Sequence, residues 1–163
     1  MHPIWTHCGC LRFASVESGS ILIWEMAFTL TPAPRKVASF PIPQETGGAE
    51  ELLLLPSPFR LAYTVNPKIL VWDVNRSELL LDSGHISSQP YFKKPSFSHD
   101  GHFFACTTGY DVYLWKESLV GYSFHQQFPV TSTSIFEAPF FSPNGESFII
   151  FATPKIQLWH TND

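Results

Sequence analysis

The sequence has few charged residues and few cysteines, and it contains no long apolar run. Charged residues make up 15% of its 163 residues, and 10 Lys and Arg against 14 Asp and Glu give a net charge of −4. Ordinary globular domains carry about 25% charged residues. No basic cluster supplies the positive surface that attracts nucleic acids and anionic membranes, so we expect neither to be a partner.

The apolar stretches are too short to cross a membrane, because a spanning helix needs about 18 consecutive apolar residues. The longest lie at 21–24, 52–55 and 148–152. No basic segment followed by an apolar one opens the chain, so we expect no secretory signal and a cytoplasmic location. The three cysteines, which are too few and odd in number for a disulfide framework, are predicted to be reduced thiols. They are Cys8, Cys10 and Cys106.

Aromatic residues are plentiful, at 15%, and four tryptophans organise the chain. Trp24, Trp72, Trp115 and Trp159 lie 48, 43 and 44 residues apart, and each ends a short apolar segment. These segments have the length and the β-branched content of buried strands. A second apolar segment precedes each one, separated from it by turn-forming residues, which predicts a hairpin in every repeat. We expect the tryptophans to pack between repeats rather than to stack on a ligand.

A first and a fourth strand complete the predicted repeat. The Phe-Ser-x-Asp/Asn-Gly segments at 97–101 and 141–145 predict a hairpin before the second strand, since Asp-Gly and Asn-Gly readily take positive φ. The sequence therefore predicts an all-β fold of four-stranded antiparallel β-propeller blades of about 43 residues, in an incomplete ring. The blades are expected at 3–43, 50–82, 92–128 and 137–161, the last without its fourth strand.

Over nearly its whole length the sequence resembles the WD40 repeat family. The resemblance rests on the two Phe-Ser-x-Asp/Asn-Gly turns, on the pair Trp72-Asp73, and on Gly84-His85 ahead of Trp115. The chain departs from the family in the residue after tryptophan, which is Glu25, Lys116 and His160 in the other repeats.

The resemblance implies one polar network and a class of function. The family's network can form once, from His85, Thr107, Asp111 and Trp115. The implied function is a non-catalytic protein-interaction scaffold, part of a larger chain or assembly, with protein partners and no cofactor. Rim loops at 29–35, 83–94 and 129–138 are the expected contact surfaces, with Tyr91 and Phe92 as a partner-binding loop. The exposed faces of the outer blades also favour self-association.

The sequence leaves two alternatives open. One is a propeller-type hydrolase with a site at the channel mouth, for which Asp111, Lys68 and Lys155 are the only ionisable residues near one repeated turn. The other is a truncated fragment without independent function. No nucleotide-binding, zinc-peptidase or hydrolase motif is present, so no catalytic residue is assigned. The cluster of His2 and residues 7–10 has metal-ligand residue types, but its place in the repeat favours a hairpin turn.

Overall fold

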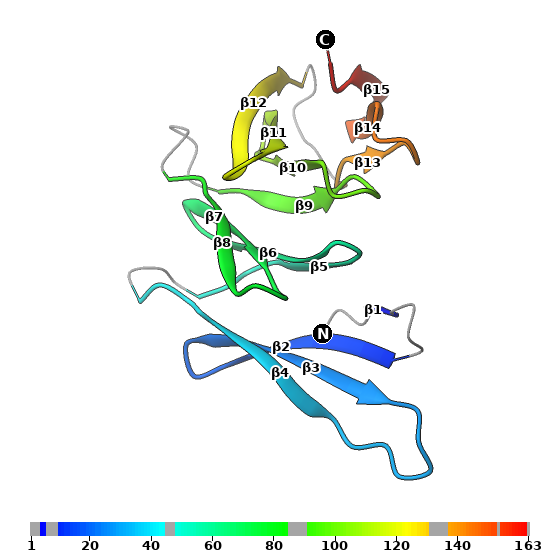
Figure 1. The fold of residues 1–163 in the computed structure, drawn as a ribbon. Helices are drawn as coiled ribbons and strands as arrows, with labels where there is room; N and C mark the ends of the chain where they lie inside the picture. The colour runs from blue at the N-terminus through cyan, green and yellow to red at the C-terminus, as the bar shows by residue number, and fades with distance from the viewer. Residues whose placement is uncertain are drawn as a thin grey trace.

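The computed structural model describes residues 4–5, 10–44, 48–84, 91–130, 137–152 and 154–162. Within this part of the chain no helix is long and apolar enough to cross a membrane. Its fifteen strands form four antiparallel sheets (Figure 1). They are β1 (Ile4–Trp5), β2 (Cys10–Glu17), β3 (Ser20–Ala27), β4 (Arg35–Pro41), β5 (Leu52–Pro56), β6 (Phe59–Val65), β7 (Lys68–Asp73), β8 (Glu78–Asp82), β9 (Lys93–Phe97), β10 (Phe103–Thr107), β11 (Asp111–Ser118), β12 (Gly121–Pro129), β13 (Phe140–Phe141), β14 (Ser147–Ala152) and β15 (Lys155–His160).

Each sheet is one blade, built from strands that follow one another in the chain. Blade one is β1–β4, blade two is β5–β8 and blade three is β9–β12, while blade four has the three described strands β13–β15. Figure 1 shows the blades in chain order, with blades one and four at the two ends of the row and no closure between them. The predicted all-β fold of propeller blades in an incomplete ring is confirmed.

The two predicted Asp-Gly and Asn-Gly turns form hairpins in which the glycine takes a positive φ. In the turn before β10, the Gly101 amide donates to the Ser98 carbonyl at 3.0 Å, and Gly101 takes a φ of +75°. The turn before β14 repeats this geometry, with the Gly145 amide donating to the Ser142 carbonyl at 2.9 Å and a φ of +71°. Positive φ is the conformation that glycine adopts without steric cost.

A β-bulge recurs immediately before the tryptophan in each four-stranded blade. The pairing of the third and fourth strands shifts between Ile23 and Trp24, and the same shift falls before Trp72 and Trp115. A bulge places one extra residue on one strand and bends it. In blade two the extra residue is Leu80, on β8. At this bulge the Leu80 carbonyl oxygen lies against Gly121 of blade three.

The core consists of three layers, one between each pair of neighbouring blades. The largest buried side chains include Phe40, between blades one and two, Phe104, between blades two and three, and Phe148, between blades three and four. The stability of the array thus depends on blade-to-blade burial, as in other repeat architectures.

Candidate functional site

The structure describes three of the four residues of the predicted polar network. Trp115 is fully buried, and the Thr107 hydroxyl donates to the Lys93 carbonyl at 3.0 Å. Asp111 is half-buried, and its amide donates to the Thr108 hydroxyl at 3.1 Å in the turn before β11. His85 lies outside the described residues, so the network remains a prediction.

The four tryptophans occupy equivalent places, and each of them contacts an aromatic ring of its own blade or of the neighbouring blade. The Trp72 ring lies 5.1 Å from that of Phe40, and the Trp159 ring lies 5.0 Å from that of Phe128, both across a blade boundary. Trp24 instead stacks on Phe13 of its own blade, with ring centroids 6.4 Å apart. Trp72, Trp115 and Trp159 thus lie in the clusters between blades, whereas Trp24 lies on the outward face of blade one.

The predicted partner-binding loop divides into one exposed and one buried residue. Tyr91 is 57% exposed, whereas Phe92 is 1% exposed. The Phe92 ring packs edge-on against Tyr113 at 5.5 Å and Trp115 at 6.1 Å. Because Phe92 belongs to the core between blades two and three, its assignment to a contact surface is wrong, and only Tyr91 can serve in one.

The ionisable residues considered for a hydrolase begin the third strands of three different blades. Lys68 forms an ion pair with Asp82 of its own blade at 3.4 Å. Asp111 and Lys155 begin β11 and β15. Among the described residues, no group of three or more His, Cys, Asp or Glu side chains is arranged to hold a metal ion.

A cross-strand side-chain pair recurs at the same register position in all four blades. It joins the residue twelve positions before each tryptophan to the residue directly after that tryptophan. These two residues are paired across the second and third strands of the blade. Blades one and two have the ion pairs Arg12–Glu25, at 2.9 Å, and Arg60–Asp73, at 2.5 Å. Blade three has Lys116 over the Phe103 ring at 5.4 Å, and blade four has a hydrogen bond between Ser147 and His160 at 2.9 Å. The departures from the WD40 pattern after tryptophan therefore each have a partner.

The Glu25 carboxylate makes the stability of blade one depend on pH. Hydrogen bonds from Arg12 and Arg35 lower the pKa of Glu25 from its ordinary value of 4.5. Its stabilising contribution is complete above pH 4.5 and is lost as the pH falls through the lower folded pKa. We expect Glu25→Gln to lower the free energy of unfolding by about 1 kcal/mol or less at neutral pH, and the difference to disappear in acid. Urea unfolding at both pH values measures it, with Glu17→Gln as the control; a difference that persists unchanged in acid would contradict the assignment.

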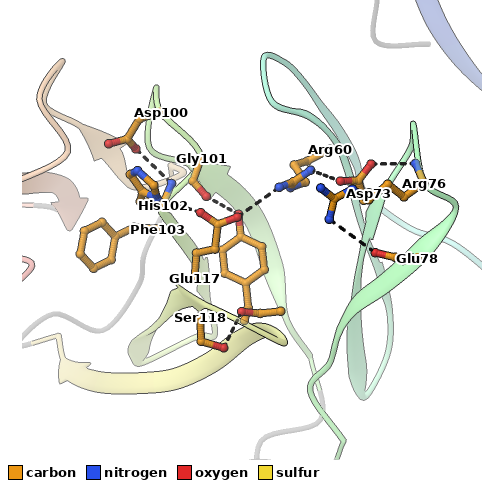
Figure 2. Close-up of polar contacts among 12 residues, drawn as sticks. Arg60, Asp73, Arg76, Glu78, Asp100, Gly101, His102, Phe103, Glu117 and Ser118 are labelled. Carbon is orange, nitrogen blue, oxygen red and sulfur yellow. Dashed lines mark hydrogen bonds and ion pairs between the residues drawn. The ribbon is translucent and has the colours of Figure 1, made fainter.

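Arg60 connects blades two and three through a cluster of charges, of which Arg60 and Asp73 are buried. One of its terminal nitrogens donates to Asp73, and the other donates to Glu117 of β11 at 3.1 Å (Figure 2). Glu117 in turn contacts His102 Nδ1 at 2.8 Å, while Asp73 accepts the Arg76 amide at 2.9 Å. The Arg60 Nε has no hydrogen-bond partner in the described part of the chain. The guanidinium is therefore held in one orientation by a carboxylate on each side.

A hollow of about 380 Å³ opens beside this cluster, between the outer strands of the two blades. Its polar wall is the cluster itself, with Arg76 and Glu78. Its apolar rim is Leu79 together with the turn between β11 and β12, where Leu119 and Val120 are fully exposed. A two-residue hairpin turn does not need apolar side chains, since Asn, Asp and Gly satisfy its geometry better. This rim and hollow, named here the outer hollow, form the candidate site.

The tip of the β11–β12 hairpin is fixed against blade two. Gly121 takes a φ of +123°, and a Cβ on it would lie 2.3 Å from the carbonyl oxygen of Leu80, the bulge residue of β8. The buried Tyr122 hydroxyl donates to the Gly101 carbonyl, and burial raises the pKa of this tyrosine. Ser118 closes the turn by donating to the Gly121 carbonyl at 2.9 Å. Leu119 and Val120 are thus presented on a turn that is anchored by Ser118 and Gly121 on either side of them.

A second, larger groove of about 580 Å³ follows the first strands of blades two, three and four. Its walls are β5, β9 and β13, which face the position of the channel in a propeller. The lining is apolar, with His99 at one side. In the described residues this groove is the channel wall of the incomplete ring.

Comparison with known proteins supports the fold through solved structures only. No family model matches the sequence, and no curated protein matches it. A chain in a crystal structure of the mitotic checkpoint complex is 16% identical, with a TM-score of 0.62 over 97% of this chain and 48% of its own. A chain in a complex of KlAtg21 with the coiled coil of AgAtg16 is 12% identical, with a TM-score of 0.71 over 98% of this chain and 52% of its own.

The chain therefore spans about half the length of the structures that it matches. At these identities the likeness shows the fold and nothing further. Together with the four antiparallel sheets, it places the chain in the class of β-propeller folds, as an incomplete set of blades.

Proposed function

We propose that the chain is a non-catalytic protein-interaction scaffold of the WD40 type, and that a protein partner docks on the outer hollow. The observation that carries this proposal is the exposed Leu119–Val120 turn, which is packed against blade two beside the buried Arg60–Asp73 pair. Apolar side chains that the fold does not need are exposed beside a concave surface whose charges are already oriented.

The outer hollow shares with binding hot spots the arrangement of apolar anchors beside polar groups. Such spots join a few apolar anchors to a surrounding ring that excludes water. Leu79, Leu119 and Val120 supply the anchors, and Arg76 and Glu78 at the mouth supply charges of both signs. The anchored turn reduces the entropy lost on binding. Such a surface favours a partner with an apolar side chain that enters the hollow between polar groups.

The fold and its neighbours support a protein partner. One neighbour belongs to a mitotic checkpoint complex, and KlAtg21 is in complex with a coiled coil. Both are assemblies of proteins, which is the setting that the resemblance to WD40 repeats implies. We further propose a cytoplasmic location, which rests on the sequence alone.

Replacing Leu119 with aspartate is expected to abolish docking without affecting folding. Because the side chain is fully exposed, the thermal midpoint should stay within about 1 °C of that of the natural chain, while a hot-spot anchor contributes about 2 kcal/mol to binding, or more than tenfold in affinity. The measurement is photocrosslinking in an extract of the source organism, with benzoylphenylalanine in place of Val120. Unlabelled natural chain should prevent formation of a discrete adduct, and Leu119→Asp should compete at least about tenfold more weakly.

Leu30 offers the matched control, since it is also a fully exposed leucine but lies in the loop between β3 and β4 of blade one. Leu30→Asp should compete as well as the natural chain. Equal competition by Leu119→Asp and Leu30→Asp would exclude the outer hollow as the docking site. A discrete adduct that natural chain fails to prevent would mean that the contact is nonspecific.

A further inference from the structure

The outward face of blade four is an apolar surface that resembles the buried faces of the other blades. Paired positions of β13, β14 and β15 place five apolar side chains on it. We name this surface the tail face. Its residues are Phe140, Ile149, Phe151, Ile156 and Leu158.

Equivalent positions in the earlier blades are completely buried by the next blade. Ile156 and Leu158 lie three residues and one residue before their tryptophan, and they are 65% and 61% exposed. The six residues at the same positions in blades one, two and three are 0% exposed. These six are Ile21, Ile23, Ile69, Val71, Val112 and Leu114. The tail face thus has the composition of a blade-to-blade interface, and no described residue of the chain covers it.

The outward face of blade one is the complement of the tail face. The side chains of β2 and β3 that point away from blade two form three cross-strand pairs, all half-buried. We name this surface the head face. Its residues are Leu11, Phe13, Ser15, Leu22, Trp24 and Met26.

Each blade boundary inside the chain joins a surface of the tail type to a surface of the head type. The earlier blade contributes the residues before its tryptophan, and the later blade contributes its tryptophan face. At the first boundary Ile21 and Ile23 lie in one cluster with Trp72, and at the third Val112 and Leu114 lie in one cluster with Trp159. The described part of the chain makes this type of contact at all three boundaries, and in this part the tail face and the head face have no such contact.

We infer that the tail face of one copy is covered by the head face of a second copy, and that two such contacts close a ring from two chains. The neighbours, which are about twice as long as this chain, support this ring, because two copies supply a comparable length of blades. The arrangement is two-fold symmetric, and both head faces and both tail faces are used. The outer hollow lies on neither face, so the inference is independent of the proposed docking function.

Sedimentation analysis of charge variants, alone and mixed, tests this arrangement. Ile156→Asp/Leu158→Asp disables the tail face, and because both side chains are already exposed the change should not unfold blade four. Leu22→Asp disables the head face, and Met26→Lys is a second head variant in case Leu22→Asp fails to fold. A circular dichroism melt verifies the folding of each variant.

The natural chain should sediment at twice 18.5 kDa. Each variant alone should be a monomer, and an equimolar mixture of a tail variant and a head variant should form a dimer again, since one intact head can cover one intact tail. If the tail variant alone is a monomer and the head variant alone is a dimer, the copies join tail to tail. That result would overturn the inference. A monomeric natural chain, or a mixture that stays monomeric, would also overturn it.

Discussion

Replacing Gly121 with alanine is expected to lower the free energy of unfolding by about 3 kcal/mol or more, among the largest effects of any single methyl group added to this chain. Two causes act together. At a φ of +123° an L side chain is strained, and the new Cβ would lie 2.3 Å from the Leu80 carbonyl oxygen. That oxygen belongs to the backbone of a bulged strand and cannot swing away as a side chain would. The β11–β12 hairpin must therefore move away from blade two, and equilibrium urea unfolding measures the effect.

Two other glycines separate the causes. Gly19 has a φ of +80° with no atom within 4 Å of an added Cβ, so Gly19→Ala should cost only the backbone strain, about 1–2 kcal/mol. Gly109 has open space and no positive φ, so Gly109→Ala should change stability by about 0.5 kcal/mol at most. If Gly121→Ala were no more destabilising than Gly19→Ala, the close contact between the two blades would not exist in solution.

The fold could be predicted because its signals are local. Each turn lies within a few residues of the strands that it joins, as the turns with Gly101 and Gly145 show. These turns and the apolar segment before each tryptophan together define the hairpins. Blade three, for example, is expected to end at 128, and its last strand, β12, ends at Pro129.

The candidate site could not be predicted in the same way. The Arg60–Asp73 pair follows from a fixed register around tryptophan, and aligning the repeats at that register would have found it. The Arg60–Glu117 pair joins residues 57 apart, and the contact of Gly121 with Leu80 depends on how two blades pack. Phe92 was misassigned for a related reason, because its neighbour Tyr91 is exposed and only the tertiary structure shows that the next side chain points inward.

Removing the Asp73 carboxylate is expected to destabilise the chain by about 3–5 kcal/mol, because it leaves the buried Arg60 guanidinium without its nearest counter-charge. Only 11% of the Arg60 side chain and 8% of the Asp73 side chain are exposed, so water cannot replace the lost partner. Asp73→Ala also removes the acceptor of the Arg76 amide. Asp73→Asn retains an acceptor oxygen for that amide, and equilibrium unfolding of both variants separates the charge from the hydrogen bond.

The exposed pair Arg76–Glu78 provides the control within the same hollow. Its atoms lie 3.9 Å apart and its side chains are 73% and 60% exposed, so Glu78→Gln should change stability by about 0.5 kcal/mol or less. The double variant Arg60→Met/Asp73→Leu should recover most of the stability lost in Asp73→Ala, since apolar residues of similar volume can replace a buried pair. A double variant as unstable as Asp73→Ala would show that the cost does not arise from the buried Arg60 charge. Recovery would show that the cost arises from that charge, which in Asp73→Ala keeps Glu117 alone as its counter-charge.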